Sequence, residues 1–158
     1  MDNIIWKDLK NFGGLYQINN EGTVKSLDRY VYHNGNDKFQ FIRGRKISMR
    51  VNNHGYLSIR LSRDSKTATR FVHRLLAETF IENPLELPFV NHKDGNKLNN
   101  ALDNLEWVTH SQNMKHAYSM GLIKGKSKIP SILIKPDRVL KKYRDMKKQN
   151  LGIEKNVV

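Results

Sequence analysis

The sequence predicts an α+β fold with three parts: a small antiparallel β-rich module over residues 1–70, a compact strand–loop–strand–helix unit over 71–121, and a linker with a basic helical tail over 122–158. Three observations support this prediction. Short runs in the first part alternate apolar and polar side chains around turn signals. In the second part, two short apolar runs flank a polar loop and precede a helix start. The tail combines an apolar stripe with many basic residues.

The first part is expected to contain β-hairpins. The run GLYQINNEGTVKSL, residues 14–27, alternates around NNEG, where Gly22 supplies the positive φ of a tight turn. Residues 44–51 and 56–62 predict two further strands that flank the turn signal NNHG. In both strands apolar and polar side chains alternate. One face of the sheet they form is therefore expected to lie in the core, and the other face is expected to be basic. The apolar positions are Ile47, Met49, Val51, Leu57, Ile59 and Leu61, and the alternating positions are Lys46, Ser48, Arg50, Ser58, Arg60 and Ser62.

The second part is predicted to begin with a short strand over residues 69–72 that leads into a helix. Residues 73–81 carry apolar side chains at helical spacing, and two following prolines end that helix. The short apolar runs 89–92 and 105–109 are expected to be strands on either side of a loop rich in asparagine.

A further helix is predicted directly after the second of these strands. Thr109 is expected to cap it, and Gln112 can bond back to the cap, which is the capping-box pattern. The helix is expected over residues 110–120, with Gly121 as its C-terminal stop. Asn113 therefore lies in its first or second turn.

The tail differs in composition from the rest of the chain. Residues 125–131 resemble a linker, and residues 136–150 predict an amphipathic basic helix. An isolated helix of this length is only marginally stable in water, so it needs a partner surface or DNA. Its apolar stripe is Val139, Leu140, Tyr143 and Met146.

The overall charge indicates a polyanionic partner. The chain of 158 residues carries 28 Lys and Arg against 15 Asp and Glu, a net charge of +13. Such a balance is typical of proteins that bind nucleic acid or an anionic membrane surface. No apolar stretch approaches a membrane-spanning length, and the N-terminus lacks the pattern of a signal peptide. The absence of cysteine excludes disulfides and cysteine-bound zinc and fits an intracellular, cytoplasmic setting.

The charge is concentrated in two blocks. Residues 41–75 carry 9 basic and 1 acidic groups, a net +8, and residues 126–158 carry 10 and 3, a net +7. Between them, residues 76–125 carry 4 basic and 6 acidic groups, a net −2. This pattern is expected if the two basic stretches bind the phosphate backbone of a nucleic acid and the acidic stretch between them binds a cation. An ordinary solvated surface is the alternative interpretation.

The residues that remain for chemistry are histidines and asparagines of the segment VNHKDGNKLNNALDNLEWVTHSQNMKHA, residues 90–117. The run DGNKLNN does not match a calcium loop, because the glycine is misplaced and no terminal glutamate follows. No nucleophilic elbow or glycine-rich phosphate loop is present. A strand-end histidine can act as a general base, and an asparagine oxygen can bind Mg²⁺. Taken one residue at a time, ordinary hydrogen bonds within a loop explain the same residues.

The spacing in this segment resembles the HNH nuclease motif of phage and intron-encoded homing endonucleases. The matching runs are VNHKDGNKLNN (90–100) and NLEWVT (104–109), followed by a helix that bears Asn113. The defining residues fall at His92, Asn104 and Asn113. Upstream, VHRLLAETFIENP resembles the helix that precedes this motif, and WKDLKNFGGLYQINNEGTVKSL resembles an associated N-terminal module.

The resemblance implies that residues 71–121 form a ββα-metal unit that cleaves DNA. It implies that His92 is the general base and that Asn104 braces the loop and helps to orient His92. One divalent metal ion, Mg²⁺ with Mn²⁺ as an alternative, would be held by Asn91 and Asn113. His116 is a reserve candidate, because a histidine follows the ligand on this helix in other branches of the family.

The implied function is metal-dependent, site-specific but sequence-tolerant DNA endonuclease activity that leaves a 3′-hydroxyl and a 5′-phosphate. Nicking and double-strand cleavage both remain open. Many relatives carry aspartate where this chain has Asn91, and a neutral amide holds Mg²⁺ less strongly than a carboxylate does. A catalytically degenerate DNA-binding protein on the same scaffold is therefore the alternative, while a ribosomal-type RNA-binding protein would not explain the motif spacing.

The expected partner is double-stranded DNA, bound by a monomer without membrane association, in the host cytoplasm if the protein is phage-encoded. The basic strands would hold phosphates, and the tail, which resembles the start of a helix-turn-helix, would extend the contact. The candidate DNA-binding residues are Arg43, Arg45, Lys46, Arg50, Arg60, Arg70, Lys141, Lys142 and Arg144.

Overall fold

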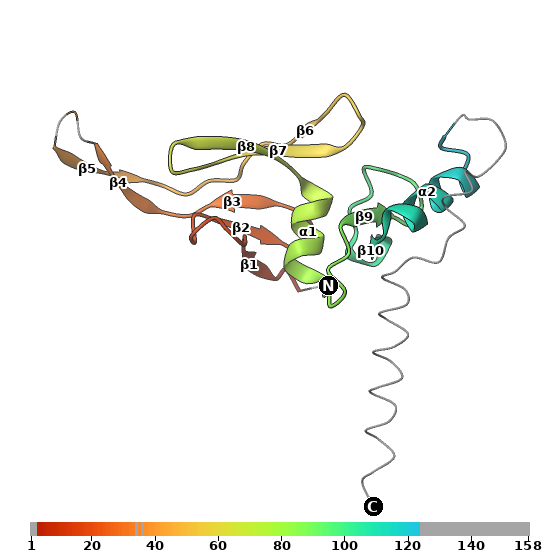
Figure 1. Ribbon diagram of the computed structural model, residues 1–158. Coiled ribbons are helices and arrows are strands. Elements are labelled where there is room, and N and C mark those ends of the chain that lie inside the picture. Colours follow the sequence, from red (N-terminus) through yellow and green to blue (C-terminus); the bar gives the residue numbers. More distant parts are fainter. Residues whose placement is uncertain (1–2, 34, 36, 124–158) are drawn as a thin grey trace, which may run out of the picture. The chain divides into compact units, whose positions relative to one another are not determined.

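The computed structural model describes residues 3–33, 35 and 37–123 and confirms the α+β class, with small antiparallel sheets and two α-helices among these residues (Figure 1). The described chain divides into two compact units. The first contains residues 3–82 and 92–106, and the second contains 83–91 and 107–123. The predicted tail helix, with Lys141, Lys142 and Arg144, lies outside the described residues.

The first unit begins with a three-stranded antiparallel sheet, in the order β1 (Trp6–Asp8), β2 (Tyr16–Asn19) and β3 (Val24–Ser26). Strands β2 and β3 form the hairpin that was predicted, and Gly22 in its turn has φ of 86°. Ile18 and Val24 are fully buried. The alternating pattern of this stretch therefore places its apolar side chains in the core.

A two-stranded ribbon follows, made of β4 (Arg29–His33) and β5 (Lys38–Ile42). Its register places Tyr30 opposite Phe41 and Tyr32 opposite Phe39. The facing rings lie 5.2 and 5.1 Å apart between centroids. All four rings are exposed, so the ribbon carries an uncovered aromatic face.

A second three-stranded sheet contains β6 (Arg50–Val51), β7 (Leu57–Arg63) and β8 (Lys66–Phe71). The prediction of a strand over residues 44–51 was wrong for most of its length, since only the last two residues pair with β7. The preceding backbone instead bonds to β3: Ser26 N–H donates to Arg45 O, and Ile47 N–H donates to Val24 O, both at 2.9 Å. This pairing takes residues 45–47 away from β7.

The prediction of one apolar and one basic face holds only in part. Ile59 and Leu61 are buried and Arg60 is exposed, as expected. Val51, however, is 56% exposed, although it pairs with Leu57 of β7. Ser58 is buried, and its hydroxyl donates to Arg50 O at 3.1 Å, which satisfies the buried oxygen.

Helix α1 (Val72–Phe80) follows β8 directly and packs against β2 and β7. Its residues Val72, Leu75 and Leu76 lie in the core of the first unit, and this helix confirms the one predicted over residues 73–81. Among the described residues, no helix has the length and apolarity needed to cross a bilayer.

The segment that resembles a nuclease motif folds as predicted. Strand β9 (Phe89–His92) pairs with β10 (Leu105–Val108), and the 3₁₀ turn η1 (Leu102–Asn104) precedes β10. Helix α2 (His110–Ser119) follows.

The start and end of α2 confirm the capping prediction. Gln112 N–H donates to the Thr109 hydroxyl at 3.2 Å, and Thr109 N–H donates to Gln112 Oε1 at 2.8 Å. Each residue thus satisfies a backbone donor of the other at the helix start. At the other end, Gly121 has φ of 65°, a conformation that glycine adopts without strain.

Candidate active site

The loop between β9 and η1 is held by a network around one carboxylate. Asp94 Oδ1 accepts hydrogen bonds from Asn96 N–H at 2.8 Å and from the Asn104 amide at 2.9 Å. Its other oxygen accepts from the Asn99 amide at 2.7 Å. These donors favour the charged carboxylate, so the bonds from Asn99, then Asn104, then Asn96 hold the pKa of Asp94 below its ordinary value.

Asn104 bridges the two ends of this loop. Its Oδ1 accepts from Asp94 N–H at 3.1 Å, and its amide nitrogen donates to Asn99 O at 2.8 Å as well as to the Asp94 carboxylate. Its own backbone oxygen accepts from Lys93 N–H at 2.9 Å. The many asparagines of this segment therefore replace the regular backbone hydrogen bonds that an irregular loop lacks.

His92 is the last residue of β9 and is buried, with only 5% of its surface exposed. Its Nε2 lies 3.0 Å from Asn100 Oδ1. The ring is also flanked by those of His73 and Tyr56, with centroid distances of 4.9 and 6.1 Å. The imidazole is thus fixed by one polar and two ring contacts, which limit its rotation.

His73, whose ring contacts that of His92, is buried, and its Nδ1 has no hydrogen-bond partner among the described residues. Burial, and then the nearby charges of His92 and Arg74, lower the pKa of His73 to about 4. His73 is therefore neutral at pH 7 and places no fixed positive charge beside His92.

The predicted metal ligands belong to the second unit. Asn91 is buried in β9, and Asn113 is the fourth residue of α2, where its N–H donates to Thr109 O at 3.0 Å. The reserve candidate His116 lies one turn further along the same helix and is half-buried. His92 and Asn104 belong to the first unit.

The donor set fits a hard divalent cation. In the described part of the chain, no three His, Asp or Glu side chains form a group that could hold a metal. The predicted ligands are instead two amide oxygens, a donor type that Mg²⁺ accepts, and Mg²⁺ usually leaves its other positions to water and phosphate. The residues present are therefore compatible with a metal that binds mainly through its substrate.

A basic groove in the first unit gathers four of the candidate DNA-binding residues. Arg45, Lys46, Arg50 and Arg60 line it, together with Ser48, Ser58 and Thr69, around a volume of about 500 Å³. All four basic side chains are exposed. Four cations and the exposed hydroxyls of Ser48 and Thr69 around one concave surface suit the oxygens of a phosphate backbone.

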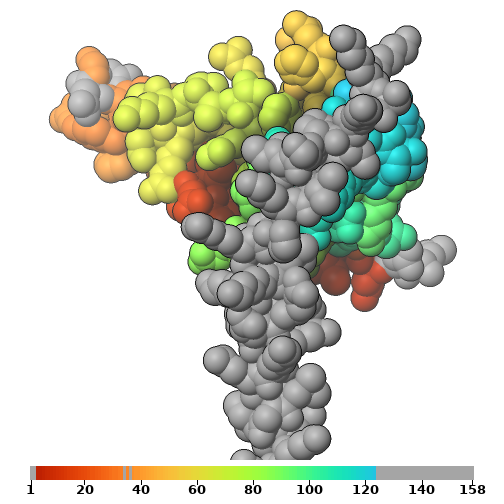
Figure 2. Space-filling view, turned by 45° about the vertical axis from the view of Figure 1, so that its right-hand side comes forward, coloured from red at the N-terminus to blue at the C-terminus, as the bar shows by residue number. Residues whose placement is uncertain are grey.

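The other two described candidates are exposed but do not line this groove. Arg43 follows β5, and Arg70 lies in β8. All six residues of β8 are exposed, and the strand forms part of the surface that Figure 2 shows in yellow-green.

Asn100 is the residue near His92 that the sequence interpretation did not single out. Its side chain, and not that of Asn104, bonds to the His92 ring. Motif spacing alone could not identify it, since Asn96, Asn99 and Asn100 are three amides in one loop. Their different partners are visible only once the loop is folded.

Two family models match consecutive parts of the chain. The model described as the NUMOD4 motif matches residues 5–62. The model described as HNH endonuclease matches residues 70–115, which include the loop and helix described above.

Known proteins match across both parts. The DNA endonuclease I-HmuI of Bacillus phage SP01 is 35% identical over 151 residues, which cover 90% of this chain and 79% of the relative. An uncharacterized HNH endonuclease of Acanthamoeba polyphaga mimivirus is 40% identical over 119 residues, which cover 75% of this chain but only 31% of that protein. A solved structure described as "DNA binding and cleavage by the HNH homing endonuclease I-HmuI" matches with a TM-score of 0.60 and 36% identity, over 77% of this chain and 62% of that chain.

Proposed function

The chain belongs to the HNH homing endonuclease family and is a DNA endonuclease, and we propose that it hydrolyses phosphodiester bonds to a 3′-hydroxyl and a 5′-phosphate at sites it recognises with some tolerance of sequence. The main support for this proposal is that His92 is buried and held in a fixed orientation at the start of a loop that hydrogen bonds brace.

His92 serves as the general base in this proposal. Its imidazole takes a proton from a water molecule, and the water oxygen attacks phosphorus in line with the 3′ oxygen that leaves. The surrounding contacts support this role, because a base must be held in one orientation to accept a proton along the attack path. Asn104 supports His92 indirectly, by bracing the loop that begins at the same residue.

Asn91 and Asn113 are the residues that would hold a divalent metal ion, with Mg²⁺ as the expected ion and Mn²⁺ as an alternative. When bound, this ion stabilises negative charge on the scissile phosphate and on the leaving 3′ oxygen. Since neither proposed ligand is a carboxylate, binding of the metal ion depends strongly on the phosphate oxygens of the substrate. His116 is the reserve ligand.

The DNA-binding part of the proposal rests on the basic groove. Its lining residues Arg45, Lys46, Arg50 and Arg60 would contact phosphates, and Arg43 and Arg70 would extend the contact. The matching I-HmuI structure, which is described as one of DNA binding and cleavage by that protein, supports DNA as the partner, and our proposal is that this DNA is double-stranded.

We propose that three consecutive segments of the chain have different functions. Residues 1–70 form a DNA-binding β module, 71–121 form the nuclease unit, and 122–158 extend the DNA contact. We propose that the protein acts as a monomer in the cytoplasm of its host cell.

A degenerate DNA-binding protein is the second candidate, and Asn91 is the residue that favours it. A neutral amide attracts Mg²⁺ less than a carboxylate does, so in this candidate the site holds the ion too weakly for turnover.

Incubation with supercoiled plasmid and with host genomic DNA separates the two candidates. The nuclease proposal predicts nicked or linear product with Mg²⁺ or Mn²⁺ and none with EDTA. DNA binding without cleavage under either cation would establish the degenerate protein instead.

A further inference from the structure

We infer that Asn100 is a positioning residue that fixes which nitrogen of His92 carries the proton, an assignment that rests on the proposed role of His92 as general base. A neutral imidazole has one N–H and one basic nitrogen. An amide oxygen only accepts hydrogen bonds, so at 3.0 Å from Asn100 Oδ1 the His92 Nε2 must be the donor. The basic lone pair therefore lies on Nδ1.

This tautomer determines how the proton moves. The Nδ1 lone pair takes one proton from water, and the water oxygen forms the new bond to phosphorus. The bond from phosphorus to the 3′ oxygen breaks with its electron pair on that oxygen, which then takes a proton from solvent water to give the 3′-hydroxyl. His92 then carries both protons as a cation. Asn100 Oδ1 still accepts from Nε2, so the same contact also stabilises the charged ring.

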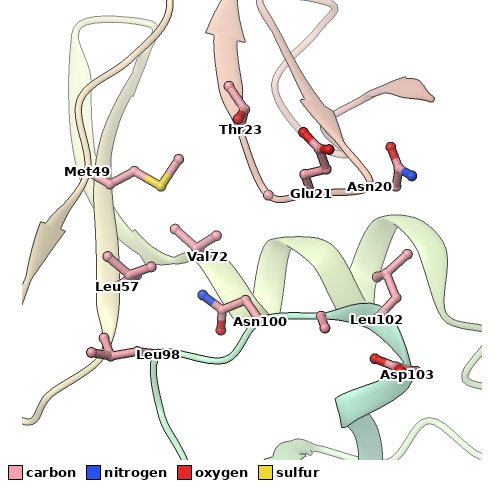
Figure 3. A pocket seen from close by; sticks show the side chains of 12 residues that line it. Asn20, Glu21, Thr23, Met49, Leu57, Val72, Leu98, Asn100, Leu102 and Asp103 are labelled. Atoms are coloured by element: carbon pink, nitrogen blue, oxygen red, sulfur yellow. The ribbon is translucent and has the colours of Figure 1, made fainter. Parts of the chain in front are cut away.

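The position of Asn100 is well defined within the first unit. Asn99 precedes it and is bonded to Asp94 and to Asn96 O, while the turn η1 follows. Asn100 also lines a pocket of about 780 Å³ beside the apolar residues Val72 and Leu102, as Figure 3 shows.

The variant Asn100→Leu tests this assignment, because leucine has a similar size and no acceptor. We expect kcat to fall by about tenfold to a hundredfold, with KM for DNA within about twofold of the parent. Asn100→Asp keeps an oxygen acceptor and should retain activity near that of the parent. Asn96→Ala is the matched control, since the Asn96 side chain accepts from Leu98 N–H at 3.1 Å and does not bond to His92.

¹⁵N NMR of the His92 ring supplies a measurement that does not depend on cleavage. We expect the Nε2–H tautomer in the parent and in Asn100→Asp, and a mixture in Asn100→Leu. An Nδ1–H tautomer in the parent, or parental kcat in folded Asn100→Leu, would overturn the assignment. If the parent fails to cleave DNA, the proposed function fails, while the NMR result still decides the tautomer.

A separate observation concerns the aromatic face of the β4–β5 ribbon, and we propose that this face stacks on unpaired bases of the DNA substrate. Tyr30 and Phe39 are each 71% exposed, and Tyr32 and Phe41 about half exposed. Uncovered aromatic surface of this extent marks an interaction site.

The surrounding charge selects the partner. Of the nearby basic residues, Arg29 and Lys38 alternate with the rings and lie on the other face of the ribbon, whereas Arg43, Arg45 and Lys46 follow β5 in the chain. Asp37 accepts a hydrogen bond from the Tyr32 hydroxyl. Aromatic rings with basic residues close by in the chain can bind single-stranded nucleic acid, because the rings stack with bases and the basic residues attract phosphates.

The test compares the two faces of the ribbon by fluorescence anisotropy in EDTA, with labelled oligothymidine and with a duplex. Tyr30→Leu with Phe39→Leu keeps apolar side chains but removes two stacking rings. We expect a loss of at least about tenfold in single-strand affinity and little change for the duplex. The control, Val31→Ala with Gln40→Ala, alters residues that alternate with the aromatic ones and should leave both affinities unchanged.

Three results would overturn the stacking proposal: equal losses from both pairs of substitutions, a loss confined to the duplex, or a dimer in sedimentation that the leucine substitutions dissociate. Since EDTA prevents metal-dependent cleavage, none of these results depends on whether the enzyme cuts DNA.

Discussion

Asn104 and Asp94 are joined in both directions: Asn104 Oδ1 accepts from Asp94 N–H at 3.1 Å, and the Asn104 amide donates to the Asp94 carboxylate at 2.9 Å. The two residues come from opposite ends of the loop that follows His92. Their pairing, together with the bond from Asn104 to Asn99 O, closes that loop without regular secondary structure.

Replacement of Asn104 should therefore destabilise the protein and also reduce cleavage. Asn104→Ala removes all of these bonds, and we expect a loss of about 2–4 kcal/mol in the free energy of unfolding. Urea unfolding followed by circular dichroism measures it. Asn53→Ala, in the exposed turn before β7, is the control and should change stability by less than about 0.5 kcal/mol. Similar stability of the two variants would contradict the bracing role.

The pH dependence of stability should reveal His73. Its pKa is about 4 in the folded protein against 6.5 ordinarily, so the unfolded chain takes up the proton first as the pH falls. The contribution of His73 to the free energy of unfolding is therefore complete above about pH 6.5. It declines as the pH falls toward about 4, by a total on the order of 3 kcal/mol. Below that range, Asp94, whose folded pKa is lowered, should contribute a further loss.

His73→Phe isolates this contribution. Phenylalanine keeps a ring beside Tyr56 and Phe71 and removes the buried nitrogen that has no partner among the described residues. The free energy of unfolding of the variant should change less between pH 6.5 and 4 than that of the parent. At pH 7 the variant should be no less stable than the parent. An unchanged slope would assign the pH dependence to other groups.

The basic groove should set the salt dependence of DNA binding. Replacing Arg45 and Lys46 by alanine should make the log–log slope of affinity against salt shallower by about 0.9 for each lost phosphate contact. Fluorescence anisotropy with a duplex in EDTA measures that slope. Lys7→Ala with Lys10→Ala removes the same charge outside the groove and should leave the slope nearly unchanged. Equal slopes for both double variants would show that the groove is ordinary surface.

The proposed metal ligands should respond to the choice of ion. Asn113→Ala is expected to lower cleavage in Mg²⁺ and to recover in part at high Mn²⁺. Asn91→Asp should hold or raise activity in Mg²⁺, because a carboxylate binds a hard cation more strongly than an amide does. Cleavage rates over a titration of each ion measure both effects. Loss of activity in Asn91→Asp at every Mg²⁺ concentration would argue against Asn91 as a ligand.

Local patterns were sufficient to predict the elements next to the motif. The capping pair Thr109 and Gln112 lies within one turn, and a hydrophobic run alone defines the strand at 89–92, so neither depends on distant contacts. Motif spacing also led to His92 and Asn104. The catalytic roles of these two residues, the metal ligands and the DNA contacts all remain predictions.

Elements that depend on distant partners were missed. The backbone near Arg45 bonds to β3, about twenty residues earlier, and so does not continue β6 as its alternating pattern suggested. The β4–β5 ribbon was not predicted, although an Asn-Gly pair at 34–35 marks a hairpin turn. Its aromatic side chains face solvent, so the usual contrast between a buried and a polar face is absent.

A comparison of His92→Ala with the parent tests whether His92 is the general base. This change removes the imidazole but leaves Asn91, Asn113 and the basic groove intact, so duplex affinity in EDTA should stay within about twofold of the parent. Single-turnover cleavage in Mg²⁺ should fall by about a hundredfold or more, whereas His110→Ala should cut at nearly the parental rate. Cleavage by folded His92→Ala at close to the parental rate would show that His92 is not the general base.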